Sequence, residues 1–441
     1  MLITPLLKLP TKRRNLKVNF TLVILLSFAL FFSCENQNKT AEEEAIEPTP
    51  IALTAKDILG NPDYQAISYG GYRQNTRDVQ PTMEQLKEDM KLLAAMNIKV
   101  LRTYNTHFPH ASNVLEAIDQ LKKEDPNFEM YVMLGAWINC KDAFTANPNH
   151  EEEDAEANAV EIQRAVDLAK KYDDIVKVIA VGNEAMVKWA ASYFVQPGVI
   201  LKWVSHLQKL KEDGHLSKDL WITSSDNFAS WGGGGKEYHV KDLEELIKAV
   251  DYVSLHTYPM HDTHYNPDFW GIIEEESDLT KVEQIDVAMQ RALAYAKKQY
   301  GNTAKYVDSI AAATPMHIGE TGWASASNSF YGPDGSKATD EYKEGIYHQL
   351  MRDWTNKDSI SCFYFEAFDE NWKDAGNPGG SENHFGLINL QGQAKYAIWD
   401  LVDAGAFEGL KRGENTITKT YAGNKEQLLE ATKAPPIKAV E

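Results

Sequence analysis

Two glutamates follow short apolar stretches that are typical of buried strands. Glu184 closes the run Val178–Glu184 (Val-Ile-Ala-Val-Gly-Asn-Glu), and Glu320 lies in Met316–Trp323 (Met-His-Ile-Gly-Glu-Thr-Gly-Trp). A charge at the end of a buried strand is costly, and such groups are often functional. Paired carboxylates across a cleft can cleave a glycosidic bond, because one donates a proton while the other attacks or activates water. The alternative is that both glutamates form structural ion pairs.

The elements that must position these carboxylates alternate between strand and helix from about residue 64. Eight stretches favour strands: Gln65–Tyr72, Ile98–Tyr104, Met130–Ala136, Val176–Gly182, Leu220–Ser225, Tyr252–Thr257, Met316–Glu320 and Ile360–Phe365. Amphipathic segments between them favour helices, among them Met83–Met96, Asn158–Tyr172, Val199–Glu212 and Val282–Tyr300. Continuous apolar strands separated by helices indicate a parallel sheet that is covered on both faces.

Eight such units predict an α/β fold of the (β/α)₈ TIM-barrel type, whose functional groups gather at the C-terminal ends of the strands. A doubly wound open sheet is the alternative, but it gives no reason for charged and aromatic residues to follow nearly every strand. In the barrel, Glu184 ends the fourth strand and Glu320 the seventh. We therefore expect the two carboxylates to face each other across the barrel mouth.

The first 33 residues are typical of a bacterial signal peptide. Basic residues precede the apolar run Val18–Phe32, which is too short for a spanning helix. Cys34 follows Ser33 directly, as in the lipobox of a bacterial lipoprotein, where that cysteine carries the lipid; an ordinary cleaved signal peptide is the alternative. We expect a signal peptide over residues 1–33, lipidation at Cys34, and anchoring to the outer membrane of a Gram-negative bacterium, on its periplasmic or cell-surface face.

The rest of the chain divides into a tether, one domain and a terminal segment. We expect a flexible tether over residues 34–55, a catalytic domain over 56–413, and a polar tail or peripheral wrap over 414–441. The acidic run Glu151–Glu156 predicts the solvated start of a helix, and Cys140 and Cys362 are predicted as buried free thiols. The formal net charge of −19 argues against nucleic acids and anionic polymers, but it suits a neutral polysaccharide.

Further motifs accompany the two glutamates. Asn183 directly precedes Glu184, the last strand continues into Tyr364–Lys373 (Tyr-Phe-Glu-Ala-Phe-Asp-Glu-Asn-Trp-Lys), and the first two strands contain Ser68–Gly71 and Val100–Tyr104. Over about residues 64–412 these motifs resemble clan A of the glycoside hydrolases, and most closely family 17, the β-1,3-glucanases. The resemblance implies cleavage of β-1,3-glucan of the laminarin type, endo-acting, by a monomer that needs no metal or organic cofactor.

The resemblance also implies roles for single residues. Glu184 is similar to the general acid/base and Glu320 to the nucleophile of a retaining mechanism, in which the two carboxyl groups lie about 5–5.5 Å apart. Asn183 would hold the sugar 2-hydroxyl, and Tyr258 would orient the nucleophile. The other candidates for substrate binding are Arg102, Trp137, Trp323, Glu366, Asp369, Glu370, Lys373 and Tyr69. Arg102 could equally neutralise a core carboxylate, and the tryptophans could be ordinary packing at the barrel rim.

Several readings stay open. A β-1,3-glucanosyltransferase would use the same residues, another clan A enzyme would cut mannan or β-1,4-glucan, and a glucan-binding lipoprotein would cut nothing. Trp231 could be an outer platform for sugars. His256, His261 and His264 do not have the tight spacing of a metal site, and Gly232–Gly235 lacks the pattern of a phosphate loop.

Overall fold

Eight parallel strands close into a barrel in the computed structural model, which describes residues 53–438. The strand order is β1-β10-β9-β8-β7-β6-β3-β2. The barrel strands are β1 (Gln65–Ser68), β2 (Ile98–Arg102), β3 (Tyr131–Ala136), β6 (Val176–Asn183), β7 (Trp221–Asn227), β8 (Val253–His256), β9 (Met316–Gly322) and β10 (Cys362–Phe365). This closed sheet confirms the predicted (β/α)₈ barrel and excludes the open doubly wound sheet.

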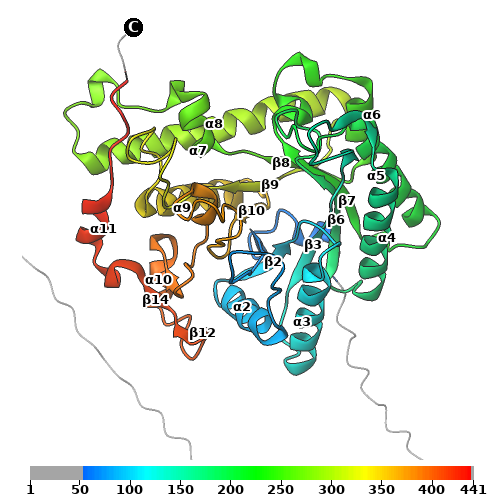
Figure 1. Cartoon of the computed structure of the whole chain (residues 1–441), viewed down its shortest axis with the longest axis horizontal. Coiled ribbons are helices and arrows are strands. Elements are labelled where there is room, and N and C mark those ends of the chain that lie inside the picture. The colour runs from blue at the N-terminus through cyan, green and yellow to red at the C-terminus, as the bar shows by residue number, and fades with distance from the viewer. Residues whose placement is uncertain (1–52, 439–441) are drawn as a thin grey trace, which may run out of the picture. The chain divides into compact units, whose positions relative to one another are not determined.

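Helices surround the barrel strands (Figure 1). The longer ones are α2 (Met83–Ala95), α3 (His110–Glu124), α4 (Ala155–Lys171), α5 (Pro197–Glu212), α6 (Lys241–Ala249), α8 (Lys281–Ile310) and α9 (Glu341–Lys357). Shorter ones are α1 (Ala55–Ile58), α7 (Pro259–Tyr265), α10 (Trp399–Asp403) and α11 (Lys425–Ala431). The predicted helices that start at Met83, Asn158, Val199 and Val282 are all present.

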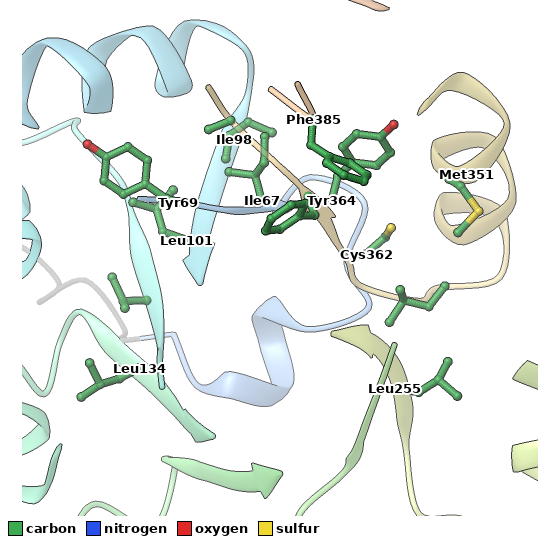
Figure 2. Close-up of a cluster of buried hydrophobic side chains, with 14 of the residues drawn as sticks. Ile67, Tyr69, Ile98, Leu101, Leu134, Leu255, Met351, Cys362, Tyr364 and Phe385 are labelled. Carbon is green, nitrogen blue, oxygen red and sulfur yellow. The ribbon is translucent and has the colours of Figure 1, made fainter. Parts of the chain in front are cut away.

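Strand side chains alternate between two hydrophobic layers. Ala66 and Val100 belong to the cluster inside the barrel, whereas Ile67 and Leu101 belong to the larger cluster between strands and helices. Figure 2 shows part of this outer cluster, including Ile67 and Leu101. Since a strand has a side-chain period of two, Arg102 of β2 points inward at the C-terminal end of the barrel.

Helix α8 ends ten residues beyond the predicted end, because it continues from Tyr300 through Gly301 to Ile310. Glycine weakens an isolated helix by about 1 kcal/mol. Here Thr303 and Val307, one and two turns beyond Gln299, are fully buried and hold the extra turns against the barrel. Tertiary packing therefore outweighs the local preference to stop.

A hairpin takes up part of the predicted helix start after β3. Strand β4 (Cys140–Lys141) pairs antiparallel with β5 (Asn149–Glu153), so the first half of the acidic run, 151–153, is strand. The second half is the predicted helix start, with Asp154 as the N-cap of α4. Glu153 forms an ion pair with Lys202 and accepts a hydrogen bond of 2.7 Å from the Trp203 indole. These partners come from α5, a distant part of the sequence, and they explain why local charge alone did not indicate the strand.

The segment after Gly413 lies on the barrel. Strand β12 (Lys411–Arg412) pairs with β13 (Asn415–Thr416), and β14 (Thr418–Lys419) pairs with β11 (Gln393–Ala394). Helix α11 contacts α9, and its Leu428 is buried. The backbone of Ile437 then pairs with Ile272. Of the two possibilities left open for this segment, the structure thus favours the wrap.

Both remaining cysteines, Cys140 and Cys362, are buried and free, which confirms the predicted thiols. The signal peptide, Cys34 and most of the tether lie outside residues 53–438. Within that range, no helix is both long enough and apolar enough to cross a membrane.

Candidate active site

A β-bulge in β9 turns Glu320 toward the barrel mouth. Between two register pairs, Leu255 with Ile318 and His256 with Glu320, β9 has one residue more than β8. The extra residue is Gly319, where a Cβ atom would collide with neighbouring side chains. A bulge interrupts the alternation of side chains, and here it brings Glu320 to the same side as His256.

Strand β6 has a similar bulge just before Asn183 and Glu184. Between Ala180 and Asn183, β6 has one residue more than the stretch of β7 with which it pairs. Gly182 lies in this stretch with a φ of +79°, a conformation that glycine adopts at little cost. Glu184 follows with a φ of +46°, which is uncommon for a residue with a side chain.

Glu320 is enclosed by hydrogen-bond donors. Its Oε1 accepts from the Tyr258 hydroxyl at 2.7 Å, and its Oε2 accepts from the Tyr104 hydroxyl at 2.8 Å and from the Arg102 guanidinium. Burial alone would raise the pKa of Glu320, but Arg102, His256 and the two tyrosine hydroxyls outweigh it and lower the pKa to about 2. The carboxylate is therefore held in its charged, nucleophilic form.

Arg102 joins the nucleophile candidate to Asn183. Arg102 is 1% exposed, and its guanidinium also donates to the Asn183 Oδ1 and, at 3.0 Å, to the Gly319 carbonyl. The structure therefore supports the neutralising role of Arg102 beside a buried carboxylate, and it adds a second role, since Arg102 orients the amide that precedes Glu184.

Glu184 lies in a more open setting. Its backbone N–H donates to the Ser225 carbonyl at 3.0 Å, and its side chain is 25% exposed. The Glu184 Oε1 lies 3.1 Å from Nδ1 of His256, whose Nε2 lies 2.8 Å from the Ser225 hydroxyl. His256 is fully buried and also helps to lower the pKa of Glu320, so one imidazole lies near both carboxylates.

Two residues near Glu184 escaped the sequence analysis. Asp226 is fully buried, and burial raises its pKa to about 6, although it accepts hydrogen bonds from the Ser230 hydroxyl and the Met186 N–H. Burial, followed by the charges of Glu184, Asp226 and Glu320, raises the pKa of Tyr193. Asp226 directly follows an apolar predicted strand, so the signal that marked Glu184 marked it too. Tyr193 lies in a loop without any such signal.

A cavity of about 1020 Å³ opens beside Glu320. Its lining includes Asn183, Tyr104 and Trp137 together with Tyr69, Glu366, Glu370 and Lys373 of the predicted site. Aromatic and charged side chains share this wall. Such a wall suits a sugar, which offers apolar C–H faces and a rim of hydroxyl groups.

Three charged residues after β10 form one buried group. Lys373 makes ion pairs with Glu366 and, at 3.2 Å, with Glu370, which also accepts a hydrogen bond of 2.8 Å from the Tyr72 N–H. Burial raises the pKa of Glu366 more than Lys373 lowers it. Its Oε1 has no hydrogen-bond partner among the described residues. A buried acceptor or donor of this kind, in the cavity wall, is available to a sugar hydroxyl.

Two predicted platforms are covered by protein. Trp323 is fully buried, donates to the Ala338 carbonyl at 2.8 Å, and packs 5.0 Å from Tyr347, centroid to centroid. Trp231 is also fully buried. Neither ring can stack on a sugar in this structure, so that prediction was wrong for both.

Asp369 and Tyr69, two more predicted substrate-binding residues, have polar partners within the protein. Asp369 is not part of the cavity lining and pairs at 2.8 Å with the buried Lys395, so the structure gives it a partner within the protein. The Tyr69 ring does line the cavity, but its hydroxyl donates to Asp89 at 3.1 Å. The sequence shows that these residues are polar, but it does not show whether their partner is another side chain or a ligand.

The histidines have separate neighbours. His256 contacts Glu184 and Ser225, whereas His261 stacks on Tyr258 and His264 on Phe330, with centroids 5.1 and 4.3 Å apart. Within residues 53–438, no three histidine, cysteine or acidic side chains gather as metal ligands would.

A (β/α)₈ barrel with two carboxylates at its C-terminal mouth, one of them kept charged beside an aromatic cavity, defines the class of glycoside hydrolases. The comparison with protein families agrees. The chain belongs to the BtgE/BtgC glycoside hydrolase family, whose domain model matches residues 66–386.

Known proteins resemble the chain to different extents. The crystal structure of an endo-laminarinase from Formosa Hel1_33_131 is 66% identical, with a TM-score of 0.87, over 88% of this chain and 99% of that one. A probable glucan endo-1,3-beta-glucosidase btgC of Aspergillus flavus is 25% identical over 338 residues, 72% of this chain. The match spans only 41% of that relative. A β-1,3-glucanosyltransferase of Rhizomucor miehei, 19% identical with a TM-score of 0.51, shares the fold.

Proposed function

We propose that the chain hydrolyses β-1,3-glucan of the laminarin type within the polymer, with retention at the anomeric carbon. The observation that carries this proposal is Glu320, charged and directed by Tyr258 and Tyr104 at the wall of the cavity. The similarity over nearly the whole length of the Formosa endo-laminarinase supports the substrate.

The mechanism assigns one task to each carboxylate. Glu320 attacks the anomeric carbon while Glu184 gives its proton to the glycosidic oxygen, so the C–O bond breaks and a glycosyl ester forms on Glu320. Glu184, now charged, takes a proton from water. The water oxygen then attacks the same carbon and releases Glu320. Asn183, which Arg102 holds at the cavity wall, would bind the 2-hydroxyl.

Product analysis over time tests this proposal. The purified domain is incubated with laminarin, curdlan, lichenan and mannan, and the products are separated by chromatography. We expect β-1,3-linked oligosaccharides of intermediate length from laminarin and curdlan. Products that first become longer would identify a glucanosyltransferase, and products from mannan would show another clan A specificity. If none of the four polymers gives a product, the remaining hypothesis is a glucan-binding protein without activity.

The stereochemistry is tested separately. Proton NMR of the first products from a β-linked oligosaccharide should show the β-anomer before mutarotation. An initial α-anomer would contradict the covalent intermediate on Glu320 while leaving the substrate assignment intact.

We also propose membership in glycoside hydrolase family 17 and a lipid anchor at Cys34, both from sequence motifs. The anchor is tested by expressing the full chain and its Cys34→Ala variant in a Gram-negative host with a labelled fatty acid. Label and membrane association that depend on Cys34 are expected. Equal partitioning of both forms into the soluble fraction would reject the anchor.

A further inference from the structure

Three aromatic rings form a row along one side of the cavity. The rings of Trp137 and Tyr193 have centroids 4.9 Å apart, and the rings of Tyr193 and Phe144 have centroids 5.6 Å apart with planes 29° from parallel. Trp137 and Phe144 line the cavity. Trp137, Tyr193 and Phe144 are called the aromatic row below.

The inner part of the row belongs to the catalytic surroundings. The Tyr193 hydroxyl donates to the Asn183 carbonyl at 3.5 Å, and the charges of Glu184 and Glu320 help to raise its pKa. Trp137 donates its backbone N–H to Glu161 at 3.1 Å. Phe144 is the next ring in the row after Tyr193.

Phe144 is held in an unusual way. Its side chain lies on the turn between β4 and β5, it is 63% exposed, and its φ is +60°, in the left-handed region. Two backbone hydrogen bonds fix the turn to the loop after β6: Phe144 N–H to the Ser192 carbonyl at 2.8 Å, and Cys140 N–H to the Tyr193 carbonyl at 3.1 Å. The loop after β6 therefore fixes where the ring is displayed.

Neither folding nor turn geometry accounts for a phenylalanine here. A left-handed position favours glycine or asparagine, and an exposed ring gains little from the hydrophobic effect. One face of the ring packs on Tyr193, and the side chain remains largely open where it borders the cavity. A ring kept open at the edge of a binding cavity suits the apolar C–H face of a sugar.

We propose that the aromatic row is a sugar-binding subsite remote from the scissile bond, with Phe144 as its outermost platform, and that it makes the enzyme prefer long β-1,3-glucan chains. This inference rests on the proposed function. A glucosyl unit stacks on Phe144 only when the chain extends that far from Glu320. Short oligosaccharides reach the catalytic carboxylates without touching it.

The test compares two substrates in a variant that keeps the backbone. Asparagine tolerates the left-handed conformation, so Phe144→Asn removes the ring without forcing the turn to move. We expect kcat/KM for laminarin to fall about tenfold, mainly through KM, and kcat/KM for laminaritriose to change by less than about twofold. Phe144→Trp should restore the laminarin value.

Phe330→Asn is the matched control. Phe330 is also an exposed aromatic residue, stacked on His264, but it does not line the cavity, so its loss should affect neither substrate. Equal losses of Phe144→Asn on both substrates, or no loss on laminarin, would overturn the subsite. Melting curves check that the variants are folded.

A binding measurement separates failure of the subsite from failure of the proposed function. Calorimetry with Glu320→Gln measures laminarin affinity without cleavage, and Phe144→Asn in that background should weaken it about tenfold. If the wild type cuts no β-1,3-glucan, the proposed function fails, but the binding measurement still tests whether the aromatic row binds sugar. Laminarin affinity that is unchanged by Phe144→Asn would reject the subsite.

Discussion

Glu320 and Glu184 lie at the same end of the barrel but in different surroundings. Glu320 is buried and receives hydrogen bonds from Arg102 and two tyrosine hydroxyls. Glu184 is partly exposed, and its side chain contacts His256. The several donors around Glu320 favour the charged form of that carboxyl group.

The difference is consistent with the proposed division of work between the two glutamates. A nucleophile must be charged when the substrate arrives, and an acid must still hold its proton. The surroundings at the end of β9 supply the first condition. Four variants test whether these surroundings have the effects described.

The largest effect is expected for Glu320→Gln. The variant keeps the size of the side chain but has no nucleophile, so we expect kcat on laminarin to fall by roughly 10⁴- to 10⁶-fold. Binding and the melting temperature should be retained. Activity near that of the wild type would contradict the nucleophile assignment.

Glu184→Ala should reduce kcat on laminarin by roughly 10²- to 10⁴-fold, the usual contribution of a general acid and base. With an activated aryl glycoside, azide should restore activity, because the leaving group needs no proton and azide replaces the activated water. The glycosyl azide should retain the β-configuration, as NMR would show. An α-azide would mean that the two roles are exchanged.

Tyr258→Phe removes one donor from the charged Glu320. A hydrogen bond to a charged group contributes about 1.5–3 kcal/mol, so we expect kcat to fall roughly 10- to 100-fold. The donor favours the ionised form, so its loss should raise the pKa of Glu320 above about 2. A profile of kcat/KM against pH should then lose activity at a higher pH on the acid side.

Tyr265→Phe is the control for this profile, because Tyr265 is exposed and lies outside the cavity. An acid limb of Tyr258→Phe that coincides with the wild type would show that Tyr258 does not tune Glu320.

The smallest effect is expected for Asp226→Asn, beside Glu184. The pKa of Asp226 is raised from 3.8 to about 6 in the fold, so its favourable contribution is complete below about pH 4 and is lost as the pH rises through 6. The variant does not ionise. Relative to it, the wild type should lose about 1–3 kcal/mol of unfolding free energy between about pH 4 and pH 7.

Urea unfolding at several pH values measures this difference, with the exposed Asp219→Asn as control. A constant difference between wild type and Asp226→Asn across that range would contradict the raised pKa.

Much of the barrel could be predicted, because buried parallel strands leave a strong local signal. Val178–Val181 and Val253–Leu255 consist mainly of β-branched or aliphatic residues, and both lie in strands. The predictions of secondary structure fail where contacts with distant parts of the chain determine the element. Helix α8 passes through Gly301 because Thr303 and Val307 are buried, and β5 forms where the charge pattern favoured a helix.

The site shows the same division. Arg102, Tyr258 and Glu370 lie at the mouth, where the motifs indicated, but Trp323 and Asp369 face the protein interior. Asp226, Tyr193 and Phe144 were not foreseen. A motif identifies residue types at strand ends, but it does not say which face of a side chain the later helices and loops will cover.

By itself, the sequence determined the strands, their order of alternation with helices, and the two glutamates at strand ends. These depend on the local pattern of apolar and charged residues, which one segment carries alone. Only the tertiary structure decided the two bulges that turn Glu320 and Asn183 inward, the low pKa of Glu320, and the open ring of Phe144. Each depends on strand register or on neighbours brought close by folding, and charge and burial act through those distances.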